Sequence, residues 1–85
     1  MFDDEKLNLT YPCRWEYKII AVAPEHVRRA VAAVIGDLPH ILSASAISRT
    51  GRYCSLRLEA TVPDEATRLE LFHALRNHPD VLMVL

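Results

Sequence analysis

The amino-acid sequence predicts an α+β fold of the ferredoxin-like type, in which a four-stranded antiparallel sheet carries two helices on one face. Two observations support this prediction. Segments of alternating apolar and polar residues are interspersed with segments of helical spacing, in the order β-α-β-β-α-β. The chain has 85 residues, which suits one small domain. Right-handed crossovers between these elements then predict the strand order 4-1-3-2.

The first ordered element is a strand that follows a short N-terminal arm. Residues 1 to 10 are polar and aperiodic, so we expect a flexible arm there and a single domain over residues 11 to 85. From Cys13 to Val22, aromatic and β-branched side chains recur at every second position, which is typical of a half-buried strand. The predicted inner side chains are Cys13, Trp15, Tyr17, Ile19 and Ala21, and the outer ones are Arg14, Glu16 and Lys18.

A helix and a weaker strand come next. Pro24 and Glu25 suit a helix start, because proline fits the first turn and an acidic residue there favours the helix dipole. Gly36 predicts the helix end, since glycine readily adopts the left-handed conformation. Residues 41 to 49 are rich in serine, alanine and isoleucine and predict the second strand. The predicted buried face of the helix consists of Val27, Ala30, Val31, Val34 and Ile35.

A tight hairpin leads into the third strand. Residues 48 to 52 form the predicted turn, in which Gly51 supplies the positive φ that such turns require. The third strand then shows the clearest alternation in the chain. Its predicted inner side chains are Cys54, Leu56, Leu58, Ala60 and Val62, and its outer ones are Tyr53, Ser55, Arg57, Glu59 and Thr61.

A second helix and a short last strand complete the pattern. Asp64 is the predicted N-cap, and residues 77 to 79 end the helix. Residues 81 to 85 are uniformly apolar and predict the fourth strand. The second and fourth strands are then the sheet edges, where a second copy or a partner strand can pair. The predicted buried face of this helix consists of Ala66, Leu69, Leu71, Phe72 and Leu75.

Three motifs carry a family resemblance over about nine-tenths of the chain. Residues 11 to 19, Y-P-C-R-W-E-Y-K-I, resemble the F-P-x-x-F-x-Y-K-V opening of the YbeD-like family. Residues 48 to 55, S-R-T-G-R-Y-C-S, resemble the S-S-K-G-N-Y-H-S hairpin of that family. Residues 83 to 85 match its M-V-L terminus. The members of this family are small bacterial proteins of unknown function. The resemblance implies a ferredoxin-like fold and a similarity to ACT-type regulatory domains, and it provides no established catalytic residues to carry over to this chain. Arg52 and Cys54 replace an asparagine and a histidine of the family pattern, which argues against a histidine-dependent role there.

Charge and composition exclude several partners. The net charge is −1, whereas a general nucleic-acid binder needs a basic excess. No apolar stretch approaches the roughly 18–20 residues that cross a bilayer, and the acidic first residues do not resemble a secretory signal. We therefore expect a cytoplasmic protein that binds neither nucleic acid nor membranes.

No catalytic, metal or cofactor site is indicated by the residue pattern. Tyr53, Arg57 and Glu59 on the third strand make a poor platform for stacking RNA bases. The four histidines are scattered, and no C-x-x-C pair is present. No Ser-His-Asp or Cys-His arrangement follows from the spacing. We therefore expect a non-enzymatic protein without a cofactor.

The leading functional hypothesis is a regulatory or adaptor module that binds another protein. Basic residues gather at the predicted hairpin tip and on the open sheet face, and arginine binds carboxylates in pairs, so an acidic partner fits. A solvated patch balanced by glutamates is the alternative for the same residues. The candidate partner-binding surface consists of Arg49, Arg52, Tyr53, Arg57, Lys18 and Arg14.

Two other functional hypotheses stay open, together with one for the cysteines. An ACT-like sensor would bind a small molecule at the first strand–helix loop, which has Glu25 but lacks the glycine typical of such sites. A small enzyme is the remaining alternative. In the 4-1-3-2 order we expect the first and third strands to be parallel neighbours, with Cys13 and Cys54 both near the strand starts on the inner face. The two thiols are then a candidate redox pair that can approach disulfide distance, which is roughly 4.4–6.8 Å between Cα atoms. Otherwise they are two reduced thiols that pack as small apolar groups.

Overall fold

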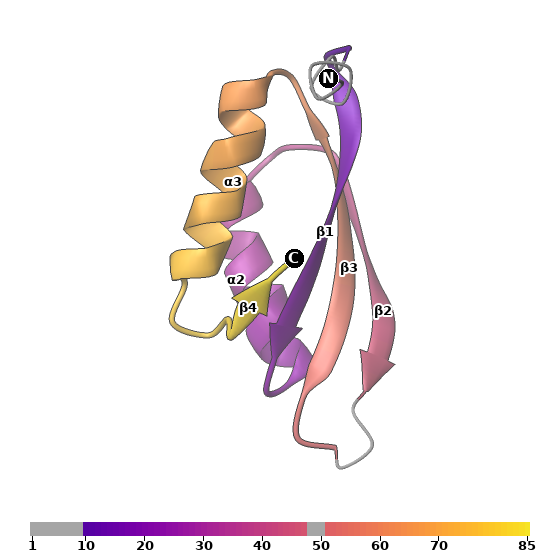
Figure 1. Ribbon diagram of the computed structural model, residues 1–85, viewed down its shortest axis with the longest axis vertical. Helices are drawn as coiled ribbons and strands as arrows, with labels where there is room; N and C mark the ends of the chain where they lie inside the picture. The colour runs from indigo at the N-terminus through magenta and orange to yellow at the C-terminus, as the bar shows by residue number, and fades with distance from the viewer. Residues whose placement is uncertain (1–9, 48–50) are drawn as a thin grey trace, which may run out of the picture.

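The computed structural model describes residues 10–47 and 51–85. Figure 1 shows the four strands as one layer with both helices packed on the same face, so the predicted α+β architecture is confirmed. Residues 1 to 9 of the predicted arm, and Arg49 of the candidate surface, lie outside the described residues. The elements in chain order are β1 (Cys13–Ala21), α2 (Pro24–Ile35), β2 (His40–Ile47), β3 (Cys54–Val62), α3 (Glu65–Asn77) and β4 (Met83–Val84).

The sheet has the order β2-β3-β1-β4, which is the predicted 4-1-3-2 order counted from the other edge. Every neighbouring pair is antiparallel. The helical crossover makes β2 parallel to β1, and the hairpin then reverses β3. The parallel arrangement of the first and third strands, on which the cysteine hypothesis depended, is therefore wrong.

The two cysteines consequently lie at opposite ends of the sheet. Cys13 is paired with Val62, whereas Cys54 is paired with Ala21 at the other end of β1. At about 3.3 Å per residue, this separates the two cysteines by roughly 26 Å. Both are free thiols, and no disulfide can join them within one folded chain.

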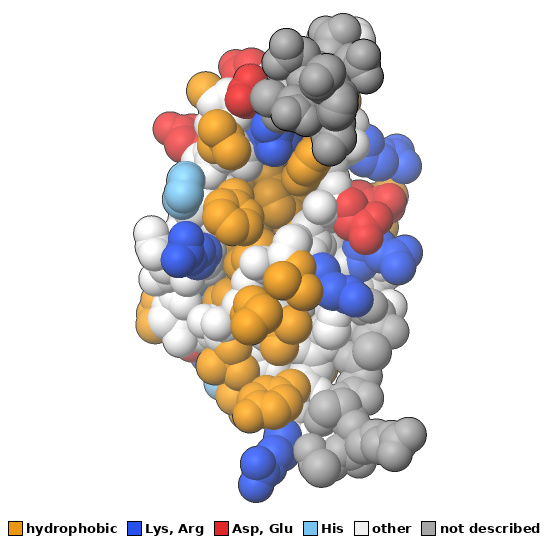
Figure 2. Space-filling view, in the orientation of Figure 1, with side chains coloured by type: hydrophobic (Ala, Val, Ile, Leu, Met, Phe, Trp, Pro, Cys, Tyr) orange, Lys and Arg blue, Asp and Glu red, His pale blue; other side chains and the backbone are white. Residues whose placement is uncertain are grey.

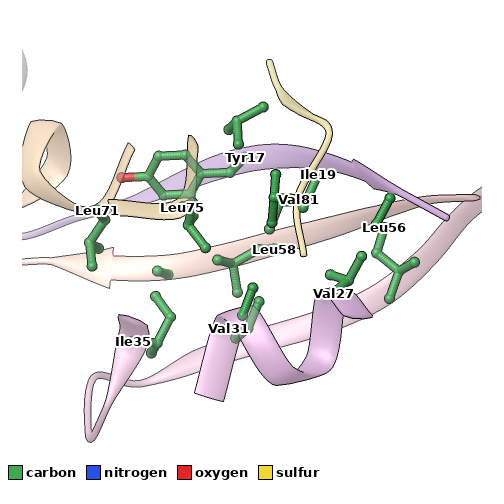
Figure 3. Close-up of a cluster of buried hydrophobic side chains, with 14 of the residues drawn as sticks. Tyr17, Ile19, Val27, Val31, Ile35, Leu56, Leu58, Leu71, Leu75 and Val81 are labelled. Atoms are coloured by element: carbon green, nitrogen blue, oxygen red, sulfur yellow. The ribbon is translucent and has the colours of Figure 1, made fainter. Parts of the chain in front are cut away.

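The core lies between the sheet and the two helices, as Figure 3 shows. The period of two in β1 and β3 is confirmed: the inner positions of β3 are all buried, and β1 is buried at every second residue from Tyr17 to Ala21. α2 begins at Pro24 and ends before Gly36, whose φ is +61°. The largest fully buried side chains are Tyr17, Ile19, Leu58, Leu75, Val27 and Val62.

The predicted N-cap of α3 is confirmed, but its predicted buried face is partly wrong. The Thr67 backbone N–H donates to Asp64 Oδ1 at 2.7 Å, which caps the helix. Leu71 and Leu75 are buried, whereas Leu69 is 42% exposed. At 100° per residue, Leu69 lies roughly 160° around the helix from Leu71, so both cannot face the sheet. Ala66 is also exposed.

β4 is shorter than the predicted strand and covers only part of its neighbour. Its ladder with β1 contains Ile19 opposite Val84 and Ile20 opposite Met83. One further backbone pair follows, in which Leu85 N–H donates to the Lys18 carbonyl at 2.8 Å and Lys18 N–H donates to the Leu85 carbonyl at 3.1 Å. The half of β1 that precedes Lys18 therefore has no β4 residue beside it.

Candidate functional site: a groove between β1 and α3

A groove of about 310 Å³ lies where β1 extends past the end of β4, between that strand and the flank of α3. Its surface is mainly apolar. The inner side chains of β1 form one wall, and the flank of α3 that carries Arg68, Leu69 and Phe72 forms the other. The residues that line it are Trp15, Glu16, Tyr17, Arg68, Leu69, Phe72 and Leu85.

Tyr17 joins the core to this groove. Its ring is only 1% exposed, and its hydroxyl donates to the Arg68 backbone carbonyl at 2.7 Å, which ties β1 to α3. Burial raises the pKa of Tyr17 to about 12, so the hydroxyl is neutral and can serve as a donor at physiological pH.

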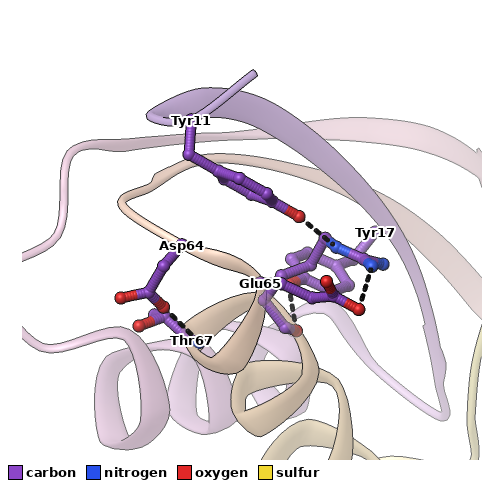
Figure 4. Close-up of polar contacts among 6 residues, drawn as sticks. Tyr11, Tyr17, Asp64, Glu65 and Thr67 are labelled. Carbon is purple, nitrogen blue, oxygen red and sulfur yellow. Dashed lines mark hydrogen bonds and ion pairs between the residues drawn. The ribbon is translucent and has the colours of Figure 1, made fainter. Parts of the chain in front are cut away.

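Arg68 is the one basic side chain in the groove lining. Its guanidinium carbon lies 4.4 Å from the ring centroid of Trp15, a cation–π distance. Its Nε donates to the Tyr11 hydroxyl at 3.0 Å, and this hydrogen bond raises the pKa of Arg68. Figure 4 shows Tyr11 and Tyr17 converging on this region from β1 and the segment before it. The site therefore holds a permanent positive charge against an aromatic wall.

The negative charge that accompanies Arg68 is peripheral. Its Nη2 lies 3.8 Å from Glu65 Oε2, at the long end of ion-pair distances. The Glu65 side chain is 59% exposed, whereas that of Arg68 is 13% exposed. Among the described residues, no other acidic side chain forms an ion pair with Arg68. A carboxylate from outside would thus find a largely shielded guanidinium that its own neighbour only weakly neutralises.

Exposed apolar side chains continue from the groove over β4. Figure 2 shows them as a nearly continuous band running between α3 and the sheet. The exposed fractions of Leu69, Leu82, Met83 and Leu85 are between 42% and 64%, which is high for large apolar side chains. A contiguous apolar patch of this kind usually marks an interaction surface. We define the apolar strip as Leu69, Leu82, Met83 and Leu85, together with the half-buried Trp15 and Phe72.

The sequence-predicted basic surface lies mostly on the outer face of the sheet, which turns away from the two helices. Arg14, Lys18 and Arg57 are exposed on the outer face, where Lys18 stands directly opposite Arg57. Arg57 Nε forms an ion pair with Glu16 Oε2 at 3.2 Å, and both side chains are about half exposed. Glu59 on the same face is opposite Glu16. The three cations therefore share their face with two carboxylates.

The hairpin residues of that surface lie at one end of the sheet. Arg52 and Tyr53 are exposed just before β3 and follow Gly51, whose φ is +74° as a tight turn requires. The structure thus brings Arg14, Lys18 and Arg57 onto one face, with Arg52 and Tyr53 beyond its end.

The expected ACT-type ligand loop does not coincide with the groove. A smaller hollow of about 160 Å³ lies beside the start of α2, where Pro24 and Arg28 approach β2 and β3. Glu25, the acidic residue of that loop, is exposed and does not line it. No cluster of three potential metal-ligating side chains occurs among residues 10–47 and 51–85. Over the same residues, no helix is long and apolar enough to cross a membrane.

The comparisons with known proteins establish the family and the fold. The model of the family "Protein of unknown function (DUF493)" matches residues 6–85. A UPF0250 protein of Hahella chejuensis is 33% identical, over 95% of this chain and 93% of its own length. Neither description assigns an activity or a ligand.

Two solution structures of protein HP0495 from Helicobacter pylori share the fold. One has a TM-score of 0.80 at 22% identity and covers 98% of this chain and 91% of its own. The other has a TM-score of 0.63 at 23% identity and covers 88% and 87%. The family match, the curated relative and the sequence motifs agree, and the chain therefore belongs to the DUF493 family, the YbeD-like proteins of unknown function.

Proposed function

We propose that this protein is a non-enzymatic adaptor or regulatory module that binds another protein through the apolar strip. The observation that carries the proposal is the exposure of Leu82, Met83 and Leu85, at 54%, 51% and 64%, in the segment whose last residue, Leu85, lines the groove. Isolated exposed apolar residues are ordinary, but a band of them rimmed by charge is characteristic of docking surfaces.

The composition of the apolar strip and the adjoining Arg68 suits a protein partner. Aromatic residues, methionine and arginine are enriched in the centres of protein interfaces, and Trp15, Phe72, Met83 and Arg68 supply all three kinds. The strip also continues past the groove over β4, which offers more contact than a small molecule requires. Trp15 and Arg68, which already pack together, are residue types that commonly dominate binding energy.

A small-molecule sensor is the second candidate, and one observation favours it. The groove volume of about 310 Å³ falls at the lower end of the range of ligand pockets, roughly 300–1,000 Å³. Arg68 would then bind the carboxylate of a compact apolar acid. A ligand of this kind raises the melting temperature by mass action in a saturable manner, whereas a pure adaptor shows no such shift in a metabolite screen.

Affinity capture from the native host, with three forms of the protein as bait, tests the proposal. Leu82→Ser/Met83→Ser alters the apolar strip, and Arg14→Ser/Arg57→Ser is the matched control on the outer face. Both pairs are exposed, so neither double variant should unfold the chain. We expect a partner that the parent and the control capture and that the strip variant loses.

Two other outcomes would redirect the interpretation. Loss of the partner with the Arg14/Arg57 variant alone would place the docking surface on the outer basic face and refute the strip. Light scattering across a range of protein concentrations measures the oligomeric state and so tests whether a second copy of this chain binds the apolar strip. A dimer that dissociates in the strip variant would show that this edge serves self-association.

A further inference from the structure

The edge of β1 beside the groove has backbone N–H and C=O groups that form no backbone hydrogen bond with another residue of the described ranges. Lys18 exchanges both of its backbone hydrogen bonds with Leu85 on this side of β1. Because the direction of backbone groups alternates along a strand, the N–H and C=O of Glu16 and Arg14 face the same side. Within residues 10–47 and 51–85, no backbone group pairs with them there. The edge therefore offers two successive positions for a strand.

The register of β4 predicts where the side chains of such a strand would lie. Val84 is opposite Ile19, and Leu85 is opposite Lys18. A strand that continues in this direction places its next residue opposite Tyr17 and the third opposite Trp15. These two positions share the inner face of β1, so their side chains enter the groove, whereas the residue between them points outward.

The two inner positions meet different chemistry. The position opposite Tyr17 faces the apolar wall formed by Leu69 and Phe72. The position opposite Trp15 faces the guanidinium of Arg68, which lies over that indole ring. An apolar side chain therefore fits the first position, and a carboxylate fits the second.

We propose that the groove binds an extended acidic segment of a partner protein as an addition to the sheet, in line with β4 and antiparallel to β1. The segment has an apolar residue, then any residue, then an aspartate or glutamate, in that order along the chain. The apolar side chain packs on Phe72, and the carboxylate pairs with Arg68. This inference depends on the proposed function and specifies which part of the partner is bound.

Trp15 provides a direct readout, because it is the only tryptophan in the sequence and lines the groove. The probe is a capped, threonine-rich peptide of seven residues that contains leucine and, two positions later, glutamate. Two controls match it: one has glutamine in place of glutamate, and one has the leucine and the glutamate exchanged. We expect saturable change in Trp15 fluorescence with the probe, and roughly tenfold weaker binding with the glutamine peptide because a charged hydrogen bond is lost. The exchanged peptide should be weaker by a similar factor.

A variant of the protein assigns the preference to one side chain. Arg68→Met should bind the glutamate and glutamine peptides equally, whereas Arg76→Met, an exposed arginine on the same helix, should retain the preference. Circular dichroism establishes that both variants are folded. The comparison of peptides on the parent protein stays decisive even if Arg68→Met is unstable.

The outcomes separate this inference from the proposed function. Equal binding of the glutamate and glutamine peptides by the parent, or no binding of either, would overturn the acidic-segment inference. Partner capture that still depends on Leu82 and Met83 would leave the proposed function standing in that case. Hexanoate, a small apolar acid, tests whether the groove binds small molecules instead. If hexanoate displaces the glutamate peptide and binds with the same affinity as that peptide, the groove is a carboxylate sensor and the inference is overturned.

Discussion

Replacing Arg68 by methionine should destabilise the protein by about 2 kcal/mol. Methionine keeps the apolar stem but removes the hydrogen bond to the Tyr11 hydroxyl, worth about 1 kcal/mol, and the contact with the Trp15 ring, worth about 1 kcal/mol when partly shielded from water. The pair with Glu65 adds little because its partner is exposed and 3.8 Å away. For a chain of 85 residues, the melting temperature should fall by roughly 10 °C.

Urea unfolding, followed by Trp15 fluorescence and far-ultraviolet circular dichroism, measures the loss. Tyr11→Phe alone should cost about 1 kcal/mol, and the same change should cost close to nothing in the Arg68→Met background, because the hydrogen bond is already absent. Glu65→Gln is the control and should stay within about 0.5 kcal/mol of the parent. Additive effects of the Tyr11 and Arg68 replacements would refute the assigned contact, as would an Arg68→Met protein as stable as the parent.

Three further predictions concern titration and thiol chemistry. The hydrogen bonds from Thr67 hold the pKa of Asp64 below its usual range, so the stability that Asp64 provides is present above about pH 4 and is lost as pH falls. The difference in melting temperature between the parent and Asp64→Ala should therefore become smaller on acidification. Asp64→Asn is the control, because asparagine keeps the cap. Burial raises the pKa of Tyr17 to about 12, so the stability that depends on its neutral hydroxyl is complete below about pH 10 and is lost towards pH 12. In a pH titration followed by tyrosine absorbance, one of the three tyrosines should ionise at higher pH than the others, and Tyr17→Phe should remove that step. Under oxidising conditions the folded monomer should keep both thiols, with Cys13 alkylated faster than the 5%-exposed Cys54, and an internal disulfide found by mass spectrometry would contradict the antiparallel register.

The architecture could be predicted because the strongest local patterns coincide with the final packing. The inner residues of β3 alternate without interruption, and the structure buries each of them. Gly36 and Asp64 mark helix ends through local backbone chemistry that does not depend on distant contacts. Where burial and local preference agree in this way, the sequence is sufficient.

The groove could not be predicted because it depends on rotations and lengths that tertiary contacts decide. Helical spacing in α3 permits either a stripe through Leu69 or one through Leu71, and only packing on the sheet selects the second. The β4 strand is shorter than its apolar run, so the open edge of β1 had no sequence signal. Arg68 resembled an ordinary surface residue between two possible stripes. Its position over Trp15 is visible only in three dimensions.

On the outer face of the two central strands, like charges stand directly opposite one another, and the ion pair between Arg57 and Glu16 forms along the diagonal. Glu16 is directly opposite Glu59, and Lys18 is directly opposite Arg57, so like charges face one another. A displacement of β3 by two residues would instead place Glu16 opposite Arg57 and Arg14 opposite Glu59. Both of those pairs would be attractive, and a two-residue displacement keeps every side chain on its own face.

Side-chain size on the inner face favours the observed alignment. Trp15, the largest side chain of β1, lies opposite Ala60, one of the smallest of β3. The displaced alignment would set Trp15 against Leu58 instead. Ala60 is fully buried, so a larger residue has no solvent to turn towards. The small side chain of Ala60 beside Trp15 thus favours one of two pairings that the binary pattern cannot distinguish.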